Sequence, residues 1–166
     1  MKHRVPLFFP LFIALSLFSC TKPNDKPTFQ MEVSYVENGG VVDATADFIY
    51  EQVVTLQTNF IFMISVSECA VCTQARADVA NYAQYKHLNV YYIELDGLSD
   101  DDYTTLRLVT LEYGEKAKAL PALISESTTI ALPMLYLFYQ GQGLAFAQES
   151  FTVTIARYVK VAPDSD

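Results

Sequence analysis

Two stretches of the chain are continuously apolar and rich in β-branched and aromatic residues, at residues 59–66 and 89–95. Such runs are typical of central strands that helices cover on both faces of a sheet. Residues 70–85, between them, show helical spacing of apolar positions and predict a helix. The side chains expected to point inward from this helix are Val71, Ala75, Val79 and Tyr82.

The chain before residue 59 predicts one strand and one helix. Residues 29–36 alternate imperfectly between apolar and polar side chains and end at a turn over 38–40, so we expect an edge strand there. Apolar side chains then recur at helical spacing over 44–56, and Asp43 precedes them as the expected N-cap.

A third predicted helix follows the strand at 89–95. It is expected to begin after Ser99 as its cap, to carry the acidic first turn of residues 100–102, and to end at Gly114. Residues 116–130 show no clear period, and Pro121 interrupts them, so they are expected to form a short helix or an irregular insertion.

The C-terminal part predicts a hairpin and a closing helix. Strands at 133–139 and 144–148 flank a glycine-containing turn, and Ser150 precedes a helix expected over 151–160. The order of elements along the chain is that of an α/β sandwich around a mixed sheet.

Composition limits the class of protein. The chain has 166 residues, of which 51% are hydrophobic, so it can form one sizeable core. Its formal net charge is −8 and it has no basic block, which makes nucleic acid an unsuitable partner.

The first residues predict export. Residues 1–19 carry a basic start and an apolar stretch too short to span a bilayer, and the sequence from Leu17 to Cys20 resembles a bacterial lipobox. We therefore expect a lipoprotein signal peptide at 1–19, lipidation of Cys20, a tether at 20–27 and one folded domain at 28–166. The mature protein would be anchored to a bacterial membrane by Cys20. It would be extracytoplasmic, in a compartment in which cysteines can be oxidised. An ordinary cleaved signal peptide or an uncleaved anchor is the alternative.

The remaining cysteines, Cys69 and Cys72, lie where the buried strand at 59–66 passes into the helix at 70–85. A thiol in the first turn of a helix faces unsatisfied backbone N–H groups, which stabilise the thiolate. A second cysteine three residues later is close enough to form a disulfide with it. In this interpretation Cys69 is the attacking thiolate and Cys72 the resolving thiol.

This order of strands, helices and cysteines resembles the thioredoxin-like family. The resemblance implies a three-layer α/β sandwich, with a central mixed sheet flanked by helices and an insertion before a hairpin that begins with a cis proline. It assigns the cis bond to Pro133, with Pro121 as the rival position, and implies that Leu132 and Pro133 bind substrate beside the cysteines.

The sequence departs from the family pattern at three sites, one of which is a dipeptide. Glu68 stands where an aromatic residue usually precedes the first cysteine, and its carboxylate disfavours a thiolate at Cys69. The dipeptide Ala70-Val71 replaces the frequent Gly-Pro, and Met63 stands where many members carry a buried acid.

The resemblance implies a thiol–disulfide oxidoreductase that acts on thiols or disulfides of exported proteins and exchanges electrons with a redox partner protein. The alternative is a non-catalytic binding lipoprotein that keeps the fold with an idle Cys69–Cys72 pair. A metal carrier using both thiolates is a third reading, but a closed zinc site needs four ligands. We expect no cofactor and no metal.

Overall fold

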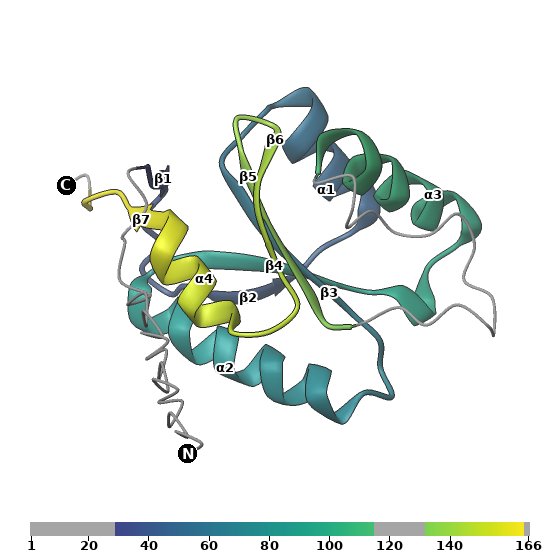
Figure 1. The fold of residues 1–166 in the computed structure, drawn as a ribbon, viewed down its shortest axis with the longest axis horizontal. Helices are drawn as coiled ribbons and strands as arrows, with labels where there is room; N and C mark the ends of the chain where they lie inside the picture. The colour runs from purple at the N-terminus through teal and green to yellow at the C-terminus, as the bar shows by residue number, and fades with distance from the viewer. Residues whose placement is uncertain (1–28, 115–131, 165–166) are drawn as a thin grey trace, which may run out of the picture.

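A five-stranded mixed sheet forms the middle of the protein (Figure 1). The computed structural model describes residues 29–114 and 132–164. The strand order is β2-β4-β3-β5-β6, with β2, β4 and β3 parallel and with β5 and β6 antiparallel to their neighbours. The strands are β2 (Gly40–Asp43), β3 (Phe60–Ser65), β4 (Asn89–Glu94), β5 (Met134–Tyr139) and β6 (Gln142–Ala147).

Helices cover both faces of this sheet, as Figure 1 shows. One face carries α2 (Ala70–Lys86) and α4 (Phe151–Tyr158), and the other carries α1 (Ala46–Tyr50) and α3 (Asp100–Leu108). Two π-helical turns, Glu51–Thr55 and Val109–Tyr113, continue α1 and α3. The predicted three-layer sandwich with a central mixed sheet is confirmed.

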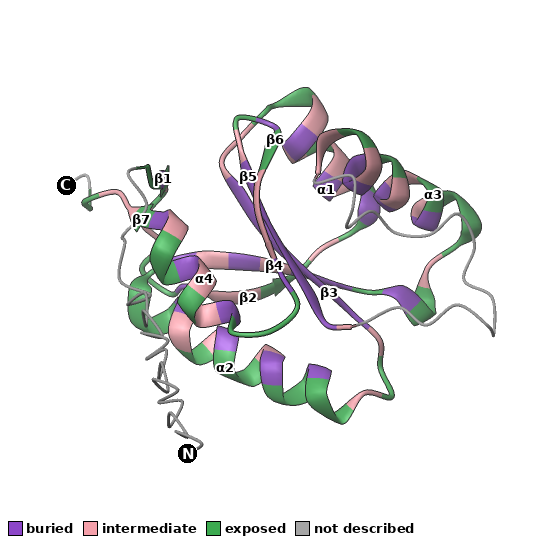
Figure 2. Ribbon diagram, viewed as in Figure 1, coloured by how far each residue is buried: buried purple, intermediate pink, exposed green. Residues whose placement is uncertain are grey.

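The sheet separates two hydrophobic clusters, and β3 contributes to both. All six residues of β3 are buried (Figure 2). Ile61 and Met63 lie in the cluster with α2 and α4, whereas Phe60, Phe62 and Ile64 lie in the cluster with α1 and α3. The prediction of a central strand covered on both faces is therefore confirmed, because successive side chains of a strand point to opposite faces.

The N-terminal elements differ from the prediction. The expected strand over 29–36 is reduced to β1 (Met31–Val33), and β2 was not predicted. Asp43 is the last residue of β2, which pairs with β4, so the N-cap of α1 is Thr45 instead. The Thr45 hydroxyl accepts a hydrogen bond from the backbone N–H of Phe48 at 3.2 Å.

The inward stripe predicted for α2 is wrong at its first position. The side chain of Val71 is 68% exposed, and the buried side chains are instead Cys72, Ala75, Val79 and Ala83. The helix is rotated so that Cys72, one position later, faces the sheet. This rotation leaves Val71 at the surface next to the cysteine pair.

The C-terminal end also differs. The closing helix ends at Tyr158, and β7 (Val159–Val161) pairs in parallel with β1 in a separate two-stranded sheet. Ser150 is the residue before α4, but its backbone is left-handed (φ 54°) and its side chain makes no capping hydrogen bond. The predicted cap at Ser99 and the helix end at Gly114 are confirmed.

Several predictions fall outside the described residues. These are the signal peptide at 1–19, the tether at 20–27 with Cys20, and the insertion at 116–130 with Pro121. Within residues 29–114 and 132–164, no helix has the length and apolar character needed to cross a membrane.

Candidate active site

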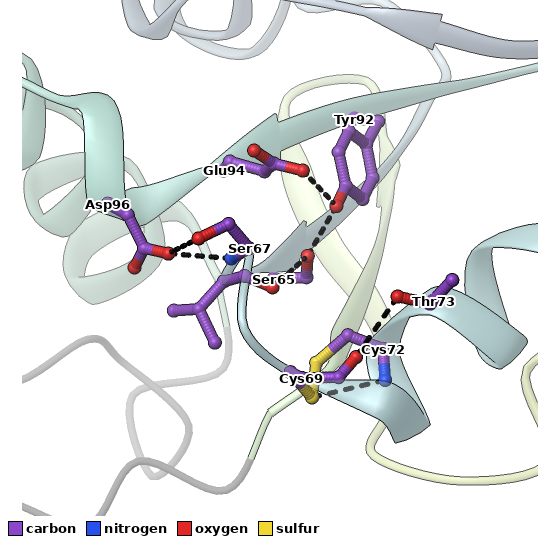
Figure 3. The surroundings of a disulfide bond; sticks show 9 residues. Ser65, Ser67, Cys69, Cys72, Thr73, Tyr92, Glu94 and Asp96 are labelled. Carbon is purple, nitrogen blue, oxygen red and sulfur yellow. Dashed lines mark hydrogen bonds between the residues drawn. A yellow bond between two sulfur atoms is a disulfide. The ribbon is translucent and has the colours of Figure 1, made fainter.

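A disulfide joins Cys69 and Cys72 at the start of α2 (Figure 3). The two sulfur atoms are 2.11 Å apart and the Cα atoms 5.1 Å apart. The chain reaches this point from the end of β3 through a three-residue loop, Val66 to Glu68. The structure thus brings the two predicted cysteines together at the junction of strand and helix.

The two cysteines differ in access. Cys72 lies on the buried side of α2 and is 1% exposed, whereas Cys69 is partly exposed. Of the two residues, only Cys69 is accessible from solvent. This asymmetry suits a pair in which one sulfur is attacked from outside and the other resolves the product from inside.

Cys69 is also the N-cap of α2. Its backbone is extended, and its Sγ accepts a hydrogen bond from the backbone N–H of Cys72 at 3.1 Å. In the reduced protein this N–H and the positive end of the helix dipole would stabilise negative charge on the Cys69 sulfur. The predicted contact between the first thiol and the helix N-terminus is therefore confirmed.

The peptide bond between Leu132 and Pro133 is cis, as predicted. Pro133 is buried and directly precedes β5, whose first residue, Met134, pairs with Ile64 near the end of β3. The start of β5 therefore lies at the edge of the sheet where β3 leads toward Cys69. Leu132 packs against the cluster shared with α1 and α3. The roles of Leu132 and Pro133 in substrate binding stay predictions.

The loop before Cys69 is fixed by Asp96, which the sequence reasoning missed. One carboxylate oxygen of Asp96 accepts hydrogen bonds from both the backbone N–H and the hydroxyl of Ser67, each at 2.6 Å (Figure 3). Asp96 follows β4, which is parallel to β3, so the ends of both strands meet at this edge. The sequence signal that could have identified Asp96 is its position as an acidic residue directly after the strand predicted at 89–95.

A polar network lies at the same ends of β3 and β4. The hydroxyl of Tyr92 donates to Glu94 Oε1 at 3.0 Å, so it accepts from the hydroxyl of the fully buried Ser65 (Figure 3). The guanidinium of Arg76, on α2, lies 3.9 Å from the centre of the Tyr92 ring and 2.6 Å from Asp43. Burial raises the pKa of Tyr92 above its ordinary value of 10.0, a value at which the hydroxyl is already protonated at neutral pH.

Two departures from the family pattern have structural counterparts. The side chain of Met63 is fully buried on the face that carries α2, and Met63 pairs with Tyr92 in the sheet. The position of the usual buried acid is therefore apolar. Glu68 is exposed in the loop before Cys69. In the described residues, no three His, Cys, Asp or Glu side chains lie together as a metal site.

The comparisons with known proteins give a likeness in structure alone. No protein-family model matches the sequence, and no curated protein matches it significantly. The crystal structure of thioredoxin O1 from Arabidopsis thaliana in the oxidised state matches with a TM-score of 0.50 and 13% sequence identity, covering 73% of this chain and 99% of the thioredoxin. Together with the strand order and the Cys69–Cys72 pair, this match shows that the chain has a thioredoxin-like fold.

Proposed function

We propose that the chain is a thiol–disulfide oxidoreductase that exchanges disulfides with exported proteins through Cys69 and Cys72. The observation that carries the proposal is the difference in solvent exposure between the two linked cysteines. Cys69 is partly exposed and accepts the N–H of Cys72, and Cys72 is 1% exposed. A disulfide serving stability alone needs neither this exposure nor this hydrogen bond.

In the reducing direction, the Cys69 thiolate attacks one sulfur of a substrate disulfide. A mixed disulfide forms, and the other substrate sulfur leaves as a thiolate that takes a proton. The Cys72 thiol then loses its proton, and its sulfur attacks the Cys69 sulfur. The Cys69–Cys72 disulfide forms, and the second substrate thiolate leaves. Two electrons pass to the substrate, and a dithiol redox partner protein then supplies two electrons that reduce the Cys69–Cys72 disulfide again. The reverse sequence of steps oxidises a substrate dithiol.

The proposed location follows from the N-terminal sequence. A lipidated Cys20 would anchor the protein to a bacterial membrane on its extracytoplasmic side, and residues 20–27 would tether the domain. Exported proteins fold there under oxidising conditions, which gives them the disulfides and thiols that the pair would exchange.

The test is the redox equilibrium of the full chain in glutathione buffers, read by alkylation and peptide mass spectrometry that separates Cys69 and Cys72 from Cys20. We expect a reversible two-electron transition in which Cys69 and Cys72 change together. The Cys72→Ser variant should accumulate a mixed disulfide with a disulfide-bonded substrate, and the matched Cys69→Ser variant should not.

The alternative is a binding protein that keeps the fold with an idle disulfide. The buried Met63 favours it, since no carboxylate stands at the position where many relatives carry one to accept a proton. A pair that stays oxidised in all glutathione buffers, or a Cys72→Ser variant that traps nothing, would decide for this alternative.

A further inference from the structure

A groove opens between α2 and the segment that leads into α4, directly beside the cysteine pair. Its volume is about 520 Å³, and it begins at Ala70 and Val71, the two residues between Cys69 and Cys72. Its far wall is the turn from Gln148 to Ser150 and the first residues of α4. A polypeptide whose sulfur reaches Cys69 would therefore have neighbouring residues within reach of the groove.

The floor of this α2–α4 groove is apolar. Val71, Ala75 and Val79 line it from α2, and Phe151 lines it from α4. Val71 lies in the first turn of α2 and is 68% exposed, because α2 packs its other face on the sheet. The groove thus offers an apolar surface, next to the reactive sulfurs, on which a large apolar side chain of a partner would be shielded from water.

The ionisable side chains that line the groove are both acidic. Asp78 comes from α2 and Glu149 from the turn before α4, and both are exposed. Asp78 accepts a hydrogen bond from the side-chain amide of Gln74 at 2.9 Å. Because this amide is neutral, it does not compensate the negative charge of Asp78. Glu68, also exposed, adds a third carboxylate just before Cys69.

The nearest cation on α2 does not neutralise these acids. The guanidinium of Arg76 binds Asp43 at 2.6 Å and lies over the ring of Tyr92, between α2 and the sheet. No Lys or Arg of the described residues lines the groove. The groove therefore combines an apolar floor with net negative charge.

We propose that the α2–α4 groove binds a cationic segment of the redox substrate, in which a large apolar side chain is flanked by Lys or Arg. The inference rests on the proposed function and names the class of substrate on which it acts. The apolar side chain would contact Val71, and the cations would pair with Asp78 and Glu149. The disulfide of such a segment would then be held beside Cys69.

The test uses the full chain, with a dithiol present to reduce Cys69 and Cys72 after each turnover, and two peptides that contain the same disulfide loop and the same Phe, flanked by Lys in one peptide and by Glu in the other. Because exposed ion pairs contribute little each, we expect the KM for the Lys peptide to be roughly three- to tenfold lower at low salt. Salt should reduce this ratio, since it screens exposed charges.

Two double variants separate the groove from the overall negative charge of the chain. Asp78→Asn with Glu149→Gln should bring the KM ratio close to one. The control, Asp101→Asn with Glu112→Gln, removes the same charge from α3 and the turn after it, on the other face of the sheet, and should keep the ratio. Equal KM values for both peptides in the wild type, or equal effects of both double variants, would overturn the proposal.

A binding measurement separates this inference from the proposed function. Disulfide-free versions of both peptides are titrated by calorimetry into the oxidised chain. Tighter binding of the Lys peptide that Asp78→Asn with Glu149→Gln abolishes supports the groove, whether or not Cys69 and Cys72 cycle. Disulfide exchange without any preference between the peptides keeps the proposed function and refutes the groove.

Discussion

The hydroxyl of Tyr92 offers a sharp test of the polar network beside the cysteine pair. Tyr92→Phe removes one oxygen atom and keeps the ring, so the guanidinium of Arg76 can remain over it. The change deletes the hydrogen bond to Glu94 and the acceptor for Ser65. The only other acceptor near the Ser65 hydroxyl is the carbonyl oxygen of Val66, at 3.4 Å among the described residues.

The magnitude follows from the burial of Ser65, which is 0% exposed. A buried hydroxyl left without a good partner costs about 1–3 kcal/mol, so Tyr92→Phe should lower the free energy of unfolding by that amount. Ser65→Ala leaves no orphaned hydroxyl, because Tyr92 keeps Glu94, and should cost about 0.5–1.5 kcal/mol. In the double variant the orphaned group is absent, so the loss should be smaller than the sum by about 1 kcal/mol.

The assay is urea unfolding of the oxidised chain followed by far-UV circular dichroism, since the protein has no tryptophan to report by fluorescence. The wild type, Tyr92→Phe, Ser65→Ala and the double variant form a double-mutant cycle. All four proteins should show the same dependence of the free energy of unfolding on urea concentration. Tyr91→Phe is the matched control, because Tyr91 is only partly buried and its ring stacks on Phe60 at 4.7 Å. Losses that add within about 0.3 kcal/mol, or a Tyr91→Phe variant as unstable as Tyr92→Phe, would refute the reasoning.

Gly39→Ala should lower the free energy of unfolding by about 1–3 kcal/mol, because the added methyl would lie 2.5 Å from the carbonyl oxygen of Leu88. Gly40→Ala has open space and should change it by less than about 0.5 kcal/mol, so equal urea midpoints for the two variants would contradict the close packing at Gly39. Alkaline pH should destabilise the protein, because burial raises the pKa of several tyrosines above the unfolded value of 10.0, and the folded state then keeps protons that the unfolded state releases. The tyrosines concerned are Tyr82, Tyr92, Tyr103 and Tyr136. Their stabilising effect is complete below pH 10 and is lost as the pH rises further; a urea midpoint that stays constant from pH 9 to 11 would contradict this.

The local signals of the sequence were strongest where one physical requirement dominated. The apolar run at 59–66 had to be covered on both faces, and β3 is fully buried. The acidic turn after Ser99 places negative charge at the positive end of the helix dipole, and the Ser99 hydroxyl caps α3 by accepting from the N–H of Asp102. The short strand β2 gave no such signal, because its four residues form a strand only by pairing with β4.

The sequence by itself determined the α/β class, the disulfide-forming spacing of Cys69 and Cys72, and the proline before the hairpin. Each of these depends on neighbouring residues, through helical or strand periodicity and through the geometry of one helical turn. Only the tertiary structure decided which helix face is buried, and therefore that Val71 is exposed while Cys72 is not. It alone brought Asp96 to Ser67 and Ser65 to Tyr92, since these contacts join β3 and β4, or the segments that follow them, and depend on the register of the sheet.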